Sequence, residues 1–321
     1  MKKKALITGI SGQDGAYLSK LLIEKDYEVL GITRINNNFN NFGLSYLGIQ
    51  NLVAVEELDI LDQSKLINLI NKFEPTEIYH LASQSSVSNS ELMPNQTIVF
   101  NITSTLNLLE AIRNNNKNIK LLNASSSEIF GKNTTLPIIE SNSFNPQNIY
   151  AISKCTSHRL VDYYRINYNT FSSNAILFNH ESYLRKENFF IKKIIRGAIN
   201  LKLKKINFLE IGDLSIKRDF GYAPEYVYAM WLIIQSSLSK NYIVSSGKSY
   251  SLESIVNFVF DKLKISKDLI KRSENLIRKN EIKDIYGDNS KIKNELNWKP
   301  TTNFFEILEK LIAEELLTKQ K

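Results

Sequence analysis

The chain has 321 residues, of which 43% are hydrophobic and 23% charged, with a formal net charge of +8. This length allows one large domain or two coupled ones, whereas the single cysteine excludes an intramolecular disulfide, and the three scattered histidines predict no metal site. The basic residues are spread rather than clustered, which argues against nucleic-acid binding, and no apolar run approaches membrane-spanning length, so we expect a cytoplasmic protein.

The first part of the chain alternates between short apolar runs and amphipathic stretches. The apolar runs predict strands, and the stretches between them predict helices with one apolar face. This alternation with short connections is typical of an α/β fold with a doubly wound parallel sheet (Rossmann) and helices on both faces. The predicted strands span 4–8, 27–32, 52–58, 77–81, 119–123 and 172–177, with helices ending near 24 and spanning 64–73, 91–114 and 149–168, and a polar surface loop at 36–41.

The pattern becomes less regular after residue 179. Four helices are expected at about 190–203, 224–238, 251–264 and 303–317, with short strands near 206–209 and 242–244. This mixture predicts a smaller, partly discontinuous α+β cap. Open α/β sheets bind their ligands at the carboxyl ends of the strands, so the cap is expected to bind the substrate there.

A glycine-rich turn follows the first predicted strand. Gly9, Gly12 and Gly15 have the spacing G-x-x-G-x-x-G between a strand and a helix. Glycines at these positions allow a tight turn and the close approach of a pyrophosphate to backbone N–H groups at a helix N-terminus. The turn therefore predicts a dinucleotide cofactor.

The end of the second strand favours one cofactor type. An acidic residue there would bind a ribose 2′-hydroxyl, whereas a basic residue accommodates a 2′-phosphate. At this position the sequence has Arg34 and no acidic residue, which predicts NADP rather than NAD. Asp59 and Ile60, after the third strand, are placed to meet the adenine, although a lone aspartate at a strand end is as often a helix cap.

A second group of polar residues gathers around the fifth strand and the helix that follows it. Ser126 and Glu128 come at the end of an apolar run, and Tyr150 and Lys154 are four residues apart on a predicted helix, which places them on one face. A hydroxyl and a carboxylate that face a phenol and an ammonium form a site that can handle protons. We therefore expect these four residues to be catalytic.

The motifs as a set resemble those of the extended short-chain dehydrogenase/reductases, and within them the GDP-mannose 4,6-dehydratases. The resemblance runs from residue 4 to about 300. The glycine turn and the Tyr150/Lys154 pair mark only the superfamily, whereas 179–182 and 218–223 are more specific for GDP-sugar dehydratases. The matching stretches are 8–15, 77–85, 124–131, 150–154, 177–182, 217–223, 278–282 and 287–291.

The resemblance implies a role for each matching residue. The catalytic positions are Ser126, Glu128, Tyr150 and Lys154. The cofactor positions are Gly9, Ile10, Ser11, Gly12, Gln13, Asp14, Arg34, Asp59, Ile60, Leu81, Ala82, Ser83, Gln84, Ser85, Tyr150, Lys154, His180 and Arg185. The substrate positions are Ser85, Ser126, Asn179, Lys193, Arg218, Arg278 and Glu281, with the basic side chains facing the diphosphate.

The resemblance also implies a domain division and an assembly. Residues 1–178, with parts of 210–245, would form the dinucleotide-binding domain, and 179–209 with 246–321 the GDP-sugar-binding domain. The partners would be a GDP-sugar and further copies of the chain, as a dimer or tetramer, with neither nucleic acid nor membrane.

Four features depart from the family pattern. Ser126 stands where the family usually has Thr, and Ile35 where it has a second arginine after the second strand. Tyr183 and Leu184 replace a usual Pro and Arg, and Ser86 replaces a His. These changes affect the identity of the sugar more than the reaction.

The expected reaction is an internal oxidation, elimination and reduction. Tyr150, with its pKa lowered by Lys154 and by the cofactor ring, would remove the C4 hydroxyl proton. Ser126 would donate a hydrogen bond to the C4 oxygen, and Glu128 would take the C5 proton before water leaves from C6. Three alternatives stay open: the same reaction on GDP-N-acetylglucosamine or a GDP-heptose, a nucleotide-sugar C4 reductase or epimerase, and a non-catalytic NADP-binding protein.

Overall fold

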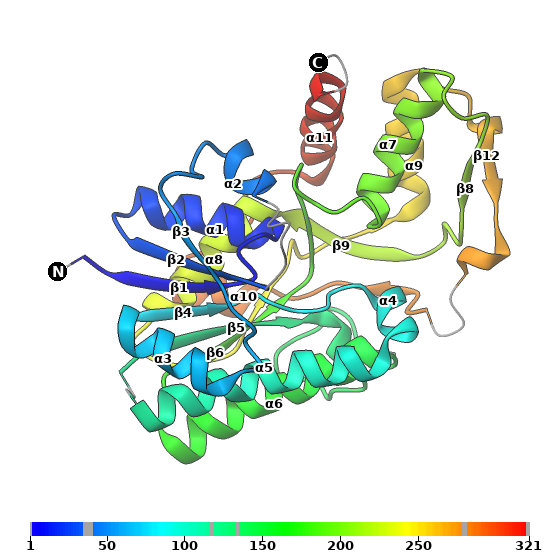
Figure 1. Ribbon diagram of the computed structural model, residues 1–321. Helices are drawn as coiled ribbons and strands as arrows, with labels where there is room; N and C mark the ends of the chain where they lie inside the picture. The colour runs from blue at the N-terminus through cyan, green and yellow to red at the C-terminus, as the bar shows by residue number, and fades with distance from the viewer. Residues whose placement is uncertain (1, 35–40, 116–117, 133–134, 278–280, 319–321) are drawn as a thin grey trace.

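A seven-stranded parallel sheet forms the centre of the molecule (Figure 1). The computed structural model describes residues 2–34, 41–115, 118–132, 135–277 and 281–318. The strand order is β10-β6-β5-β4-β1-β2-β3, so the direction of winding reverses between β1 and β4. The predicted doubly wound parallel sheet is confirmed. Its strands are β1 (Lys4–Thr8), β2 (Glu28–Thr33), β3 (Ala54–Glu57), β4 (Glu77–His80), β5 (Lys120–Ser126), β6 (Ser172–Leu177) and β10 (Tyr242–Val244).

Helices cover both faces of this sheet. In β1, Ala5 and Ile7 pack in the cluster that contains residues of α1 and α8, whereas Leu6 packs in the cluster with residues of α3, α5 and α6. Successive residues of a strand point to opposite faces, so an unbroken apolar strand is what a sheet covered on both sides requires. One face carries α1 (Gln13–Glu24), α2 (Phe42–Tyr46) and α8 (Ala223–Gln235), and the other carries α3 (Gln63–Phe73), α5 (Pro94–Asn115) and α6 (Ile149–Tyr168).

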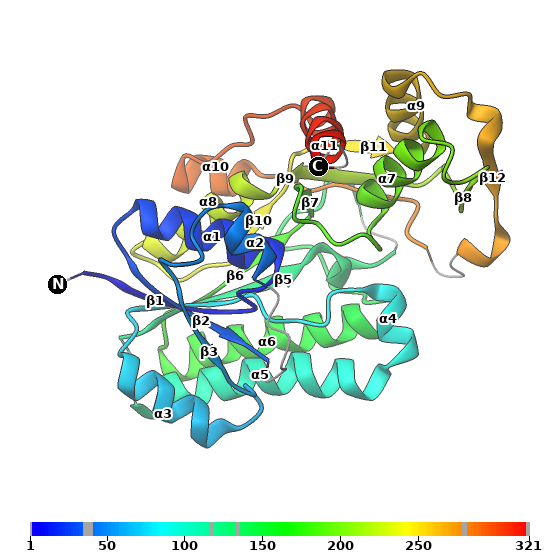
Figure 2. The same ribbon diagram turned by 45° about the horizontal axis from the view of Figure 1, so that its top comes forward.

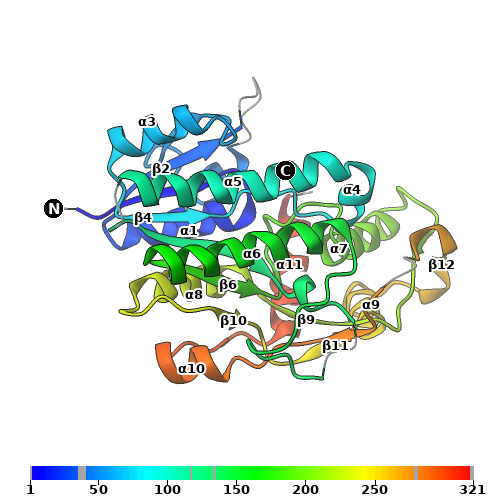
Figure 3. The ribbon, with the colours of Figure 1, turned by 90° about the horizontal axis from the view of Figure 1, so that it is seen from below.

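The helices α5 and α6 lie side by side across the face seen in Figure 3. The long helix predicted within 91–114 is α5, whereas the shorter α4 (Val87–Leu92) before it was not predicted. The break falls at Met93, whose ψ of 59° is not helical. The residue before a proline is disfavoured in the helical region, and Pro94 begins the next helix.

A smaller lobe is built around β9 (Lys217–Tyr222), as Figure 2 shows. β9 pairs with β7 (Asn179–Glu181), β11 (Ser249–Ser251) and β13 (Asp284–Ile285), and β8 (Leu209–Ile211) pairs with β12 (Ile270–Arg272). These strands pack with α7 (Phe190–Lys202), α9 (Leu252–Leu263) and α11 (Phe304–Thr318) around a separate apolar cluster. The remaining elements are α10 (Ser290–Leu296) and three 3₁₀ helices, η1 (Ser127–Phe130), η2 (Lys267–Leu269) and η3 (Glu274–Leu276).

Several sequence-based expectations need correction. The strand expected at 206–209 forms instead at Leu209–Ile211, and β7, β9, β11 and α2 were not predicted. β5 continues to Ser126, three residues past its expected end, because Ser125 and Ser126 still pair with β6. Most of the polar loop predicted at 36–41, together with Ile35, lies outside the described residues. Among the described helices, none is both long enough and apolar enough to cross a membrane.

Candidate active site

Ser126 and Glu128 sit at the carboxyl end of β5, where the strand turns into η1. Ser126 is buried, and its Oγ accepts a hydrogen bond from the Glu128 N–H at 3.3 Å. Asn148, the N-cap of α6, donates its Nδ2 to Oε2 of Glu128 at 3.2 Å while its own oxygen accepts from the Ala151 N–H. The capping residue of the next helix thus also orients the Glu128 carboxylate.

Tyr150 and Lys154 lie on the first turns of α6 and both are buried. The backbone N–H of Tyr150 donates to Ser90 Oγ at 3.2 Å, which fixes the start of the helix against α4. Lys154 Nζ donates to the Ala124 carbonyl of β5 at 2.6 Å. The predicted pairing of these two residues on one helix face, opposite the end of β5, is what the structure shows.

The pKa values of this pair differ from the expectation. Burial raises the pKa of Tyr150 to about 12, although a hydrogen bond with Ser126 and the charge of Arg185 oppose the shift. Burial also lowers the pKa of Lys154 to about 8, because the charged ammonium loses its hydration. The expected lowering of the Tyr150 pKa by Lys154 therefore does not occur in the chain alone, where burial has the larger effect.

The glycine turn leaves no room for side chains on its inner side. Gly9 has a φ of +78°, and a Cβ there would lie 2.8 Å from the Ala82 nitrogen. A Cβ on Gly15 would lie 2.5 Å from the Gly9 carbonyl oxygen. Gly12 caps α1 without a side-chain hydrogen bond. A helix N-terminus capped by glycine presents backbone N–H groups to an anion, so these residues fit the pyrophosphate of a dinucleotide.

A buried polar group joins this turn to β7. His180 Nε2 lies 3.0 Å from both carboxylate oxygens of Asp14, and its Nδ1 lies 2.7 Å from the Phe178 carbonyl oxygen. Burial would raise the pKa of Asp14, but the charge and hydrogen bond of His180 hold it below its usual value. Gln13 adds two contacts, donating to the His180 carbonyl at 3.2 Å and accepting from Ser182 Oγ at 2.7 Å. Two predicted cofactor residues, Asp14 and His180, thus contact one another.

The other predicted cofactor residues divide into those near this turn and those at the sheet edge. Arg185 lies 3.6 Å from Glu181 and its guanidinium stacks 3.6 Å from the centre of the Phe189 ring. Arg34 is exposed after β2. Asp59 is exposed and accepts from the Leu61 N–H at 3.0 Å, as a cap does. Ile10 and Ile60 are buried, Leu81, Ala82, Ser83 and Gln84 are half-buried, and Ser11 and Ser85 are exposed.

Three of the predicted substrate residues, Asn179, Arg218 and Glu281, lie on β9 or beside it, whereas Ser126 ends β5 and Ser85 follows β4. Arg218 is buried and pairs with Glu281 at 2.6 Å, and it also donates to the Ile282 carbonyl at 2.6 Å. Asn179 donates to the Asp219 carbonyl at 3.3 Å. Lys193 is half-buried on α7, and Arg278 lies outside the described residues. The structure therefore brings Arg218 and Glu281 together as an ion pair.

Sequence reasoning missed one residue that holds the loop at 81–85. Asn101 on α5 is buried; its Oδ1 accepts from the Gln84 N–H at 2.9 Å, and its Nδ2 donates to Ser153 Oγ at 2.9 Å. Ser153 in turn donates to the Tyr150 carbonyl at 2.7 Å. The only signal available in the sequence is a polar side chain on the apolar face of a predicted helix, which is weak.

Tyr183, one of the departures from the family pattern, lies apart from the proposed catalytic side chains. Tyr183 is buried, stacks on Tyr46 of α2 with ring centres 4.8 Å apart, and lies 3.9 Å beneath the Lys192 ammonium. Its hydroxyl donates to Thr318 Oγ1 at 3.0 Å. Tyr183 thus joins α2 to the smaller lobe and packs among aromatic and α11 side chains.

Comparisons with known proteins point to one family. Residues 6–311 match the family model described as GDP-mannose 4,6 dehydratase. GDP-mannose 4,6 dehydratase 2 of Arabidopsis thaliana is 37% identical, over 98% of this chain and 87% of that protein. The human GDP-mannose 4,6 dehydratase is 34% identical (96% and 90% covered), and the Vibrio cholerae protein 32% (100% and 96%).

Solved structures show the same fold at low identity. DesIV, a dTDP-glucose 4,6-dehydratase from Streptomyces venezuelae with NAD and TYD bound, gives a TM-score of 0.89 at 19% identity, covering 99% of this chain and 98% of that one. RMD from Pseudomonas aeruginosa, complexed with NADPH, gives 0.81 at 23% identity, covering 98% of each. Both NAD and NADPH are thus bound by proteins with this fold.

Proposed function

As the chain belongs to the GDP-mannose 4,6-dehydratase family, we propose that it converts GDP-mannose to GDP-4-keto-6-deoxymannose by oxidation, loss of water and reduction at one site. The observation that carries this proposal is the meeting of Ser126 and Glu128, at the end of β5, with Tyr150 and Lys154 on α6. The glycine turn that fits a dinucleotide follows β1 of the same parallel sheet.

The nicotinamide cofactor would be bound by the glycine turn, by 81–85 and by Lys154, and when bound it supplies the hydride acceptor and donor of the reaction. We propose NADP rather than NAD because Arg34, at the end of β2, is exposed and available to a 2′-phosphate. The test is titration of the protein with each dinucleotide. Tighter binding of NAD⁺ than of NADP⁺ would contradict the preference, and Arg34→Ala should weaken NADP⁺ binding alone.

Tyr150 is the proposed base for the C4 hydroxyl of the sugar. Ser126 lies close enough to Tyr150 to oppose the rise that burial causes in the Tyr150 pKa, so both hydroxyl groups are placed to reach one substrate oxygen. Ser126 would stabilise the charge that develops on this oxygen. A nearby cation favours the phenolate, and Lys154 lies one helical turn further along the same face of α6.

Glu128 is the proposed acid and base of the elimination. A C4 ketone makes the C5 proton acidic; Glu128 takes that proton and returns one to the C6 hydroxyl, which leaves as water. The hydrogen bond from Asn148 holds the carboxylate at the start of α6, beside Tyr150. Glu128 alone can therefore carry out both proton transfers.

Arg218 and Lys193 are the proposed ligands of the diphosphate, together with Arg278. Arginine suits this task because its planar guanidinium binds two phosphate oxygens at once. Arg218 is held by Glu281 and by the Ile282 carbonyl, so its guanidinium is already oriented before the substrate arrives. The domain division of the sequence analysis remains our proposal, with 1–178 and parts of 210–245 on the cofactor side, and 179–209 and 246–321 on the sugar side.

We also propose a cytoplasmic homo-oligomer. The helix α6 exposes three large apolar side chains, Ile152, Tyr163 and Ile166, and Ile166 is 75% exposed. A group of exposed apolar side chains on one helix is a candidate surface for contact with a further copy of the chain. Light scattering of the purified protein tests the proposal, and a monomer at micromolar concentration would contradict it.

The activity is tested with purified protein, NADP⁺ and GDP-mannose in D₂O, followed by mass spectrometry and proton NMR. The expected result is loss of one water, deuterium at C5 and no net reduction of the cofactor. Glu128→Gln should abolish the exchange at C5, whereas Glu306→Gln, on the exposed surface of α11, serves as the matched control. Transfer of hydrogen at C4 without loss of water would instead indicate a reductase or epimerase.

A further inference from the structure

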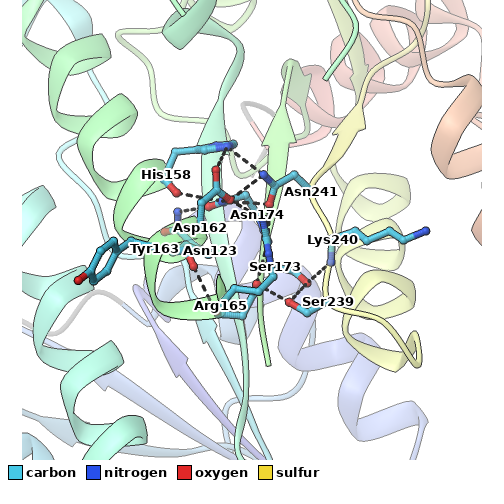
Figure 4. A network of polar contacts seen from close by, with 12 residues as sticks. Asn123, His158, Asp162, Tyr163, Arg165, Ser173, Asn174, Ser239, Lys240 and Asn241 are labelled. Atoms are coloured by element: carbon cyan, nitrogen blue, oxygen red, sulfur yellow. Dashed lines mark hydrogen bonds and ion pairs between the residues drawn. The ribbon is translucent and has the colours of Figure 1, made fainter. Parts of the chain in front are cut away.

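His158 is a buried, hydrogen-bonded histidine that the proposed reaction does not use. It lies on α6, four residues after Lys154 and therefore on the same helix face, with only 1% of its surface exposed. The structure places it inside a polar network between α6, β6 and the segment before β10 (Figure 4). Its Nδ1 lies 2.9 Å from Ser125 Oγ, and its Nε2 lies 3.1 Å from Asn241 Nδ2.

The orientation of the Asn241 amide determines the tautomer of His158. Asn241 Oδ1 faces three donors, one from Arg165 at 2.9 Å and two from Asn174 at 3.2 and 3.3 Å. Its nitrogen must therefore face His158, and it also donates to Asp162 at 2.8 Å. An amide nitrogen only donates, so His158 Nε2 accepts, and in neutral imidazole the proton is then on Nδ1.

The neighbouring carboxylate does not change this assignment. Asp162 Oδ2 lies 3.5 Å from His158 Nε2, farther than the Asn241 nitrogen. The Asp162 carboxylate is already paired with Arg165 at 2.6 Å. Nδ1–H of His158 therefore donates to Ser125 Oγ.

Two successive residues of β5 are consequently bonded to α6. Lys154 binds the Ala124 carbonyl, and His158 binds the Ser125 hydroxyl. The next residue is Ser126, which lies close enough to Tyr150 to oppose the rise that burial causes in the Tyr150 pKa. We propose that His158 is a positioning residue, which holds the end of β5 at the distance from α6 at which Ser126 meets Tyr150. This inference rests on the proposed function of Ser126 and Tyr150.

Two substitutions separate this role from a merely structural one. The side-chain nitrogen of asparagine occupies the position of Nδ1, so His158→Asn keeps the donor to Ser125 and loses the contact with Asn241. The amide of glutamine reaches the position of Nε2, so His158→Gln keeps the contact with Asn241 and loses the donor to Ser125. We expect kcat to fall by roughly tenfold to a hundredfold in His158→Gln and by less than about threefold in His158→Asn, with KM little changed in both.

Ser125→Ala provides a second measurement, because it removes the acceptor with the smallest change in volume. It should lower kcat as much as His158→Gln, and combining the two should cause no further loss. Equal loss in the two His158 variants, or an unchanged kcat in His158→Gln or Ser125→Ala, would overturn the proposal. Thermal unfolding of each variant, monitored by circular dichroism, shows whether a variant is folded.

The tautomer itself can be tested without activity. The chain has three histidines, so ¹⁵N-histidine labelling gives few imidazole signals, and loss of one set in His158→Asn assigns His158. A proton on Nδ1 is expected, and a proton on Nε2 would refute the positioning proposal. If the wild-type protein leaves GDP-mannose unchanged, the proposed function fails, whereas the NMR result is unaffected.

Discussion

The replacement of Lys154 by Met should reveal how much stability the protein loses by burying this ammonium. Methionine has a similar length, no charge and a flexible side chain that fills the same space. Burial lowers the pKa of Lys154 from 10.5 to about 8. A difference of this size corresponds to a destabilisation on the order of 3 kcal/mol at pH 7, where the ammonium is charged in both the folded and the unfolded state.

The sign of the pH dependence follows from the same shift. In the folded protein, Lys154 releases its proton near pH 8, whereas in the unfolded chain it keeps the proton up to about pH 10.5. Between these values the unfolded state binds more protons, so the free energy of unfolding rises with pH, by up to about 1.4 kcal/mol per pH unit. Lys154→Met should lack this rise. The variant should therefore be more stable than the wild type at pH 7, and this difference in the free energy of unfolding should become smaller above pH 8.

The assay is urea-induced unfolding of the cofactor-free protein from pH 7 to pH 10, followed by circular dichroism. Lys202→Met, at the exposed end of α7, is the matched control and should follow the wild-type pH dependence. Parallel pH profiles for wild type and Lys154→Met would refute the reasoning, because they would mean that Lys154 carries no burial penalty.

Three further predictions concern the site. Tyr150→Phe should lower kcat at least about 10³-fold while NADP⁺ still binds, which turnover assays and dinucleotide titration separate. Gly9→Ala should weaken NADP⁺ binding at least about tenfold, because the new Cβ would meet the Ala82 nitrogen at 2.8 Å and φ is +78°; unaltered affinity would contradict the close approach. Arg218→Gln should raise KM for GDP-mannose about 10²-fold with a smaller effect on kcat, since it removes a diphosphate ligand together with its ion pair to Glu281; an effect confined to kcat would argue against that role.

The parts of the fold that could be predicted from sequence are those with local causes. The apolar run in β1 is buried on both faces of the sheet, so it predicts a strand without knowledge of its neighbours. The helix with Tyr150 and Lys154 was predicted with its observed bounds, because Asn148 caps its start and its apolar period is regular. The predicted bounds of this helix already placed Tyr150 and Lys154 on its first turns.

The smaller lobe was not predictable in the same way. β9 contains Lys217, Arg218 and Asp219, and nothing in a charged sequence of this kind indicates a central strand. Asp219 is fully buried there and accepts backbone N–H groups from Ser246, Gly247 and Gly287, which are remote in sequence. Burial raises the pKa of Asp219 to about 6, with these hydrogen bonds opposing the shift. Strands held by long-range contacts leave little local signal.

Apart from Ser126, which keeps the hydroxyl group, the departures that lie in the described part of the chain fall around the proposed site rather than among its reacting groups. Ser86 accepts from the Asn89 N–H at 3.2 Å and caps α4, so it has a structural task where the pattern has a histidine. Tyr183 joins α2 to α11, and Leu184 packs against the position of Gly43. A residue that packs between the lobes can affect which sugar is bound only by changing the distance between the lobes. The reason for expecting another GDP-sugar is therefore weakened, and Tyr183→Phe, which removes only the contact with Thr318, should leave the preference for GDP-mannose unaltered.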